Sequence, residues 1–486
     1  MKSVQYLVGT ILFGFVFCFF VDAQEKPHKG AAWNLSHGPL RVSGDARSLV
    51  HEEGTPFLWI GDTAWEMFHR LTREEAEFFL EKRRSQGFTV IQAVALAEFD
   101  GLTLPTPAGH LPLIDQDPAR PDVKEGADND YWDDVDFMVG LAAQKGLFIA
   151  MLPTWGDKVL KKWRGEEVFT PDNAEKYGYF IGKRYGAAKN LIWVLGGDRP
   201  CERASDYAVW RAMARGIKRG EQDAEGGFHH LMTYHPMGGQ TSSRLFHQDD
   251  WLDFNMFQSG HAHQNGPNYK MVRHDFALNP VKPVLDGEPR YENHPVRGDK
   301  TKTQWFDDFD IRQAAYWSLF SGAFGHTYGC HDIWMMYDGT PERQCADART
   351  PWRKAVDLPG AWQMLHLRRL ILDGKFLAAG RRPCQEVIIG ENPEDAGYMV
   401  ATCSEDRQRA YVYIPTGRTF QLDLGKLRED VSTPIFTWFN PRTGETTGQV
   451  EQRHVDKNTW EFDPPGEEQR GNDWVLTVDL HEKTAL

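Results

Sequence analysis

Short apolar runs alternate with longer amphipathic stretches between residues 56 and 374. The apolar runs predict eight strands, at 57–62, 88–96, 147–153, 191–198, 230–235, 253–257, 283–288 and 324–329. Several of these runs are unbroken, as expected for strands that are covered on both faces. Apolar positions at helical spacing predict helices between them, at 72–87, 133–146, 171–186, 310–322 and 361–374.

The order of these elements predicts the fold of the larger part of the chain. Eight strands alternating with helices are typical of a (β/α)8 barrel, which we expect over residues 34–374. A doubly wound parallel sheet is the alternative, but no glycine-rich phosphate loop opens a helix in this sequence. Residues 34–56 predict a short hairpin that leads into the first barrel strand.

The pattern changes after Gly374. Short apolar runs separated by Gly, Pro, Asn and Asp predict a small all-β sandwich over residues 375–486. The short connection at 373–376 favours a sandwich that docks on the barrel. Two roles remain open for it, bracing the barrel or binding polysaccharide.

The first residues predict a signal peptide at 1–23. Lys2 precedes an apolar run at 7–21, and small residues follow it up to Ala23. We therefore expect a secreted or periplasmic protein, with no membrane insertion after cleavage. A signal anchor is the alternative, although the run is short for a membrane span.

Composition narrows the range of partners. The chain is 41% hydrophobic and 26% charged, which is typical of a globular protein with a sizeable core. Its net charge of −14 argues against nucleic acid and against an anionic membrane surface as partners. The six cysteines, one of them inside the predicted signal, are too widely spaced for a disulfide framework or a zinc site. The 17 tryptophans suit a sugar-binding cleft, but also an ordinary core.

Polar residues gather after the predicted strands, where barrel enzymes place their chemistry. The acids at these strand ends are Asp62, Glu98, Asp100, Asp157, Asp198, Asp286 and Glu288. Asp198 follows an apolar strand and two glycines, and Glu288 closes a similar run. A glycosidase needs two carboxylates, one kept protonated and the other ionised, and this pair suits that task. The alternative is that each acid pairs with the arginine close to it in sequence, or that Asp198 caps a helix.

Strand-end position also predicts a set of substrate contacts. The set comprises Asp62, Glu98, Trp155, Arg199, His235, Gln258, His261 and Arg290. Arg199 and Arg290 are the cations nearest in sequence to the two acids, and arginine holds a uronate carboxylate bidentately. Asp62 has an alternative role as a helix cap or support, and Trp155 as packing on the barrel rim.

No metal or other cofactor is expected. The segment "HAH" at 261–263 lacks an acid or cysteine at the spacing that a metal site requires. Two carboxylates suffice for glycoside hydrolysis.

Six segments carry a family resemblance. In chain order they are "GDTAW", "VIQAVALAEFDG", "LPTWGDK", "NAEKYGYFIGKRYG", "NLIWVLGGDRP" and "PVLDGEPRYE". Together they resemble the apiosidase-like barrel family, specifically glycoside hydrolase family 140, over residues 34–374. The later "WFNPRTGE" and "DWVLTVD" resemble the sandwich that is appended to that barrel and labelled collagen-binding. Nothing in this sequence supports collagen binding.

The resemblance implies an activity and roles for two residues. It implies cleavage of D-apiofuranosyl linkages in the side chains of rhamnogalacturonan II, a pectin, so a pectic oligosaccharide or polysaccharide is the expected partner. It also implies that Asp198 is the general acid/base and Glu288 the nucleophile, and we expect a retaining mechanism. The alternatives are a glycosidase for another furanoside, such as an arabinofuranoside, and a non-catalytic carbohydrate-binding protein. The presence of both acids argues against lost activity.

Overall fold

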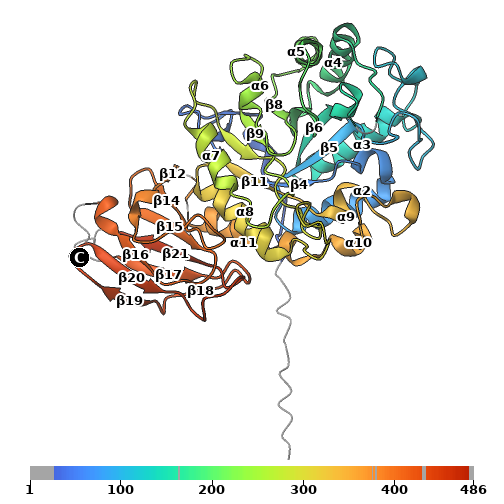
Figure 1. Cartoon of the computed structure of the whole chain (residues 1–486). Coiled ribbons are helices and arrows are strands. Elements are labelled where there is room, and N and C mark those ends of the chain that lie inside the picture. Colours follow the sequence, from blue (N-terminus) through green and yellow to red (C-terminus); the bar gives the residue numbers. More distant parts are fainter. Residues whose placement is uncertain (1–26, 163–164, 375, 378–379, 429–433, 481–486) are drawn as a thin grey trace, which may run out of the picture.

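A computed structural model describes residues 27–162, 165–374, 376–377, 380–428 and 434–480 (Figure 1). The predicted signal peptide at 1–23 lies outside the described residues. Among the described helices, none combines the length and apolar character needed to cross a membrane.

Eight parallel strands form the central sheet. They are β4 (Trp59–Thr63), β5 (Val90–Leu96), β6 (Phe148–Thr154), β7 (Leu191–Gly196), β8 (Met232–His235), β9 (Asn255–Phe257), β10 (Val284–Asp286) and β11 (Gly325–Tyr328). Their order is β8-β7-β6-β5-β4-β11-β10-β9. The two end strands meet, because the amide of Asp253 donates to the carbonyl of Met232 at 2.8 Å. The sheet is therefore a near-closed barrel, and the predicted fold class is confirmed against the doubly wound alternative.

Helices surround the barrel and include the five predicted ones (Figure 1). Those five are α2 (Arg73–Ser85), α3 (Tyr131–Gln144), α4 (Pro171–Tyr185), α8 (Asp308–Phe320) and α11 (Pro359–Asp373). The others are α1 (Met67–Arg70), α5 (Ala204–Gln222), α6 (Ser243–Phe246), α7 (Asn268–Phe276), α9 (His331–Trp334) and α10 (Trp352–Ala355). The prediction missed α5, although it has 19 residues. Two internal glycines, Gly216 and Gly220, weaken its helical signal.

Those glycines allow α4 and α5 to pack closely. A Cβ atom on Gly216 would lie 2.2 Å from the carbonyl oxygen of Glu175, and one on Gly220 would lie 2.3 Å from that of Tyr179. On the facing helix, a Cβ on Gly178 would lie 2.4 Å from the carbonyl oxygen of Met213. The glycines that cost α5 helical propensity are therefore the ones that let the two backbones touch.

Side chains alternate between the barrel interior and the helical layer, as the period of a strand requires. In β4, Trp59 belongs to the interior cluster and Ile60 to the cluster under the helices. The N-terminal strands β1 (Leu40–Val42), β2 (Leu49–His51) and β3 (Pro56–Phe57) form a three-stranded sheet, where a hairpin was predicted. Leu40, Leu49 and Phe57 join the interior cluster, so this sheet packs against the barrel core.

The C-terminal part is an antiparallel sandwich. One sheet has the order β12-β14-β15-β21-β17-β18 and the other β13-β16-β20-β19. The strands are β12 (Arg381–Pro383), β13 (Ile388–Ile389), β14 (Val400–Ser404), β15 (Arg409–Ile414), β16 (Phe420–Asp423), β17 (Ile435–Phe439), β18 (Thr446–Thr447), β19 (Glu451–His454), β20 (Thr459–Asp463) and β21 (Trp474–Asp479). β19 is exposed at every position and carries no apolar run of the kind from which the sandwich was predicted.

The sandwich docks on α8 and α11, where Figure 1 shows it beside the barrel. Arg312 on α8 forms a buried ion pair with Asp473 at 2.9 Å. The rings of Tyr316 and Tyr413 stack with centroids 4.7 Å apart, and the indole of Trp317 donates to the carbonyl of Tyr398 at 2.8 Å. The expectation of docking is confirmed, and the hydrophobic core under the helices continues into the sandwich.

Replacing a glycine by alanine should have opposite effects on stability in α3 and in α5. Gly140 lies on α3, exposed, and a Cβ there would meet nothing within 4 Å. Gly140→Ala should therefore raise the free energy of unfolding by about 0.5–1 kcal/mol, from helix propensity alone. Gly216→Ala should lower it by about 1–3 kcal/mol, because the α4 backbone occupies the space. Thermal unfolding of both variants checks this, and equal stabilisation would contradict the close packing of α4 and α5.

Candidate active site

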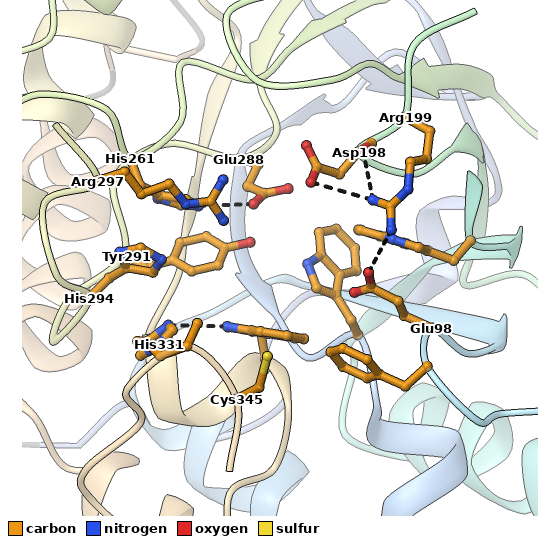
Figure 2. A pocket seen from close by; sticks show the side chains of 15 residues that line it. Glu98, Asp198, Arg199, His261, Glu288, Tyr291, His294, Arg297, His331 and Cys345 are labelled. Atoms are coloured by element: carbon orange, nitrogen blue, oxygen red, sulfur yellow. Dashed lines mark hydrogen bonds and ion pairs between the residues drawn. The ribbon is translucent and has the colours of Figure 1, made fainter. Parts of the chain in front are cut away.

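A cavity of about 420 Å³ opens at the carboxyl ends of the barrel strands (Figure 2). Its lining comes from segments that follow seven of the eight strands, all except β8. The lining residues are Trp65, Glu98, Phe99, Trp155, Asp198, Arg199, His261, Glu288, Tyr291, His294, Arg297, His331, Trp334, Cys345 and Ala346. This is the end of the barrel at which the sequence predicted a site.

The turn that carries Asp198 explains the two glycines before it. Gly196 and Gly197 have φ values of +97° and +124°, and Asp198 follows at +41°. A Cβ on Gly196 would lie 2.2 Å from the carbonyl oxygen of His235, and one on Gly197 would lie 2.7 Å from the ring of Trp155. Glycine is needed at both positions for conformation and for space. The turn presents the Asp198 carboxylate to the cavity, where the amide of Gly238 donates to its Oδ1 at 3.3 Å.

Two histidines hold the Glu288 carboxylate. His261 Nε2 donates to Oε1 at 3.0 Å, and His235 Nε2 lies 3.0 Å from Oε2. The amide of Asp198 donates to His235 Nδ1 at 3.4 Å, which leaves the His235 proton on Nε2, facing Glu288. His235 thus links the two acids.

The surroundings push the pKa values of the two carboxylates apart. Burial alone would raise the pKa of Glu288, but the hydrogen bonds from His235 and His261 lower it well below its usual range. Burial raises the pKa of Asp198, and the nearby Glu288 charge raises it further. Figure 2 shows both side chains directed into the same cavity. The two pKa values are thus shifted in opposite directions, as in sites where two carboxyl groups divide acid and base chemistry on one bond.

A third acid, Glu98, lies on the opposite side of Asp198. Arg199 Nη2 donates to Glu98 Oε1 at 3.0 Å, and Arg199 Nη1 lies 3.7 Å from the Asp198 carboxylate. Burial raises the pKa of Glu98 to about 7, although the charge of Arg199 acts to lower it. Arg199 is therefore occupied by two acids of the chain itself.

Several aromatic rings line the cavity. Trp65 and Trp155 are in contact, with ring centroids 5.1 Å apart, and Trp155 also packs on the turn at Gly197. Phe99 and Trp334 stack at 5.8 Å. Tyr291 points its hydroxyl toward Glu288 (Figure 2), and burial raises the pKa of that hydroxyl. Flat apolar surfaces beside two carboxylates suit a sugar ring.

The structure brings most of the predicted site residues together. Six of them line the cavity: Glu98, Trp155, Asp198, Arg199, His261 and Glu288. His235 is fully buried, does not line the cavity and contacts the Glu288 carboxylate. Gln258 is buried near Gly238 and is not among the residues that line the cavity, so its contact with substrate stays a prediction.

For Asp62 and Arg290 the predicted contact with substrate is wrong. Asp62 lies three residues after the inward-facing Trp59 on β4, so its side chain points to the opposite face, toward the helices. There Arg83 Nε lies 2.6 Å from its carboxylate. It supports the barrel wall, as the alternative interpretation held. Arg290 turns away from the cavity, is buried over Trp317, and donates to Gln313 on α8 at 3.0 Å. Neither side chain is placed to contact a ligand.

Sequence reasoning missed His294, Arg297 and Trp334. The first two lie in the long segment between β10 and α8, well beyond the strand end. A prediction that considers only residues just after a strand does not include them. The length of that segment was the available signal, since long loops in compact domains are commonly functional. Within the described part of the chain, no three His, Cys, Asp or Glu side chains converge as metal ligands.

Comparisons with known proteins give the family and the fold of the chain. A family model described as the apiosidase-like catalytic domain matches residues 43–378, and one described as a collagen-binding domain of a collagenase matches residues 383–479. A solved glycoside hydrolase is 34% identical, with a TM-score of 0.82 over 93% of this chain and 98% of its own. A glycoside hydrolase family 5 structure from Bacteroides vulgatus ATCC 8482 is 32% identical, with a TM-score of 0.82 over 93% and 95% of the two chains. A search of curated proteins finds no match.

Removing the imidazole of His261 should make Glu288 easier to protonate. His261→Ala deletes a hydrogen bond to a charged group, so protonation of Glu288 should become more favourable by roughly 1.5–3 kcal/mol. Carbon-13 NMR titration of labelled glutamate carboxyls measures the change, with Glu288→Gln identifying the resonance. His261→Gln keeps a side-chain donor and should shift the titration less. An unchanged Glu288 titration in His261→Ala would refute the role assigned to this histidine.

Proposed function

The chain belongs to the apiosidase-like family and is a glycoside hydrolase, and on that premise we propose that it cleaves apiosidic linkages in pectin, as a member of glycoside hydrolase family 140. One observation carries the proposal for the chemistry. The half-buried Asp198 and the buried Glu288 face a single cavity, and the pKa values of their carboxyl groups are shifted in opposite directions.

The proposed reaction is a retaining double displacement. Glu288, kept ionised, attacks the anomeric carbon while Asp198 transfers its proton to the departing glycosidic oxygen. This step forms a glycosyl ester on Glu288 and releases the leaving sugar. Asp198, now ionised, then takes a proton from water, which attacks the anomeric carbon, breaks the ester and restores both carboxyls. His235 and His261 hold the Glu288 oxygens in place during both steps.

The substrate proposal rests on the family and on the predicted export of the chain. D-Apiofuranosyl linkages in rhamnogalacturonan II side chains are the proposed target, met outside the cell or in a periplasm. Arabinofuranosides and other furanosides are the enzymatic alternative. Carbohydrate binding without catalysis is the other.

Rhamnogalacturonan II is the first substrate to test. The purified mature chain should release oligosaccharides that end in apiose, identified by mass and sugar composition. Glu288→Gln should lower the rate by roughly 10⁴-fold or more, and Asp198→Asn by roughly 10²–10⁴-fold. Asp250→Asn, which alters an exposed acid outside the cavity, serves as the control and should leave the rate unchanged.

The outcomes separate the alternatives. Release from an arabinofuranoside and not from an apioside would replace the proposed substrate. Binding of glycan without release from any furanoside would favour the binding protein.

The pH dependence should be bell-shaped. Activity should rise with pH as Glu288 ionises, at a pH below the usual range for glutamate, because two histidines stabilise its charge. It should fall as Asp198 loses its proton, at a pH above the usual range for aspartate, because burial and Glu288 oppose its charge. The measurement is kcat/KM against pH.

Glu98 provides the control, because its pKa is raised to about 7. Asp198→Asn should abolish the descending limb, whereas Glu98→Gln should retain it. If Glu98→Gln removed that limb, Asp198 would not be the general acid.

A further inference from the structure

Three arginines lie close to the two acids in the sequence or in the fold, and two of them are already occupied. Arg199 is bound by Glu98 and lies beside Asp198. Arg290 is buried against α8 and faces away from the cavity. An acidic ligand would therefore need another cation.

Arg297 differs from both. It lines the cavity, is exposed, and in the described ranges of the chain no carboxylate oxygen lies within 4 Å of its guanidinium. Figure 2 shows its guanidinium directed into the cavity, on the side where His261 holds Glu288. A guanidinium without a partner, at the mouth of a site, is available to a ligand.

The backbone fixes the position of Arg297. Its amide donates to the carbonyl of His261 at 2.9 Å, and the amide of Gly298 donates to that of Ala262 at 2.8 Å. The segment is thus tied to the loop that carries a histidine on Glu288. Because the backbone is already held, only the side chain of Arg297 has to be ordered when a ligand binds.

The neighbouring histidines do not supply the positive charge. Burial lowers the pKa of His261 and of His294, and it lowers that of His331 to about 3. The three rings pack together: His261 and His294 stack with ring centroids 4.4 Å apart, and His294 meets His331 edge to face at 4.3 Å. Arg297 is therefore the charged group on this wall.

Electrostatics also indicate which part of a substrate Arg297 would meet. Burial and Glu288 raise the pKa of Asp198, and of the cations that act to lower it, Arg297 acts most strongly. Arg297 and Asp198 line the same cavity, so Arg297 shares it with the group proposed to protonate the leaving oxygen. The chain has a net charge of −14, so an anionic substrate needs a local cation in the cavity.

We propose that Arg297 binds the carboxylate of a uronic acid in the leaving group and so selects acidic substrates over neutral ones. This inference rests on the proposed function, since it assumes that the enzyme cleaves a glycoside whose leaving sugar is acidic. It reassigns to Arg297 the uronate contact that strand-end position predicted for Arg199 and Arg290.

The test compares a pectic oligosaccharide with the same oligosaccharide after reduction of its carboxyl groups to alcohols. Arg297→Ala should lower kcat/KM for the acidic form by about 10- to 100-fold, mainly through KM, because it loses a charged hydrogen bond. It should change kcat/KM for the reduced form less than about twofold. Arg297→Lys should fall between, since lysine keeps the charge without the planar fork. Lys300→Ala removes an exposed charge from the same segment, outside the cavity lining, and should match the wild type.

Equal losses on both substrates would overturn the inference, because an effect of Arg297 on Asp198 alone does not depend on substrate charge. If the wild type cleaved neither form, the proposed function would fail instead. Calorimetric binding to Glu288→Gln then decides on Arg297 separately. The acidic form should bind about 10- to 100-fold more weakly when Arg297→Ala is added, and unchanged binding would refute the role of Arg297.

Discussion

Glu288 is a charge that the fold buries, and much of the site follows from what that charge requires. A carboxylate removed from water needs donors for its oxygens, and His261 and His235 supply them from the segments after β9 and at the end of β8. Burial raises the pKa of the second acid, Asp198, and the charge of Glu288 raises it further. His235 also accepts a hydrogen bond from the Asp198 amide, so the two carboxyl groups are held by one connected set of groups.

The backbone meets a second requirement, which is space. Asp198 can face Glu288 only if the chain turns sharply at the end of β7, against the carbonyl of His235 and the ring of Trp155. Two residues without side chains, both in the left-handed region, make that turn. Space also explains the glycines in α5. They lower its helix propensity, but α4 approaches so closely that a Cβ atom would not fit. In both places, glycines that give no clear secondary-structure pattern in the sequence are required by close packing in the fold.

The sandwich is part of the same scaffold. Its loop carbonyl at Ala396 accepts a hydrogen bond from Gln313 on α8, and Gln313 in turn accepts one from Arg290, two residues after Glu288. The buried ion pair of Arg312 and Asp473 fixes the same helix to the residue just before β21. The C-terminal domain therefore supports the strand end that carries Glu288. This contact explains why Arg290 faces away from the cavity.

Much of the architecture was determined by the sequence itself. Unbroken apolar runs and capped amphipathic helices indicated the eight strands and five of the helices, because periodicity and caps act over a few residues. Strand-end position also predicted that Asp198 and Glu288 share a site, and both line one cavity. Only the tertiary structure decided which strand-end groups face the ligand. Asp62 and Arg290 turn to the helical layer, while Arg297 reaches the cavity from far along a loop. The direction of a side chain depends on neighbours that are distant in sequence, and so do its pKa and its partners.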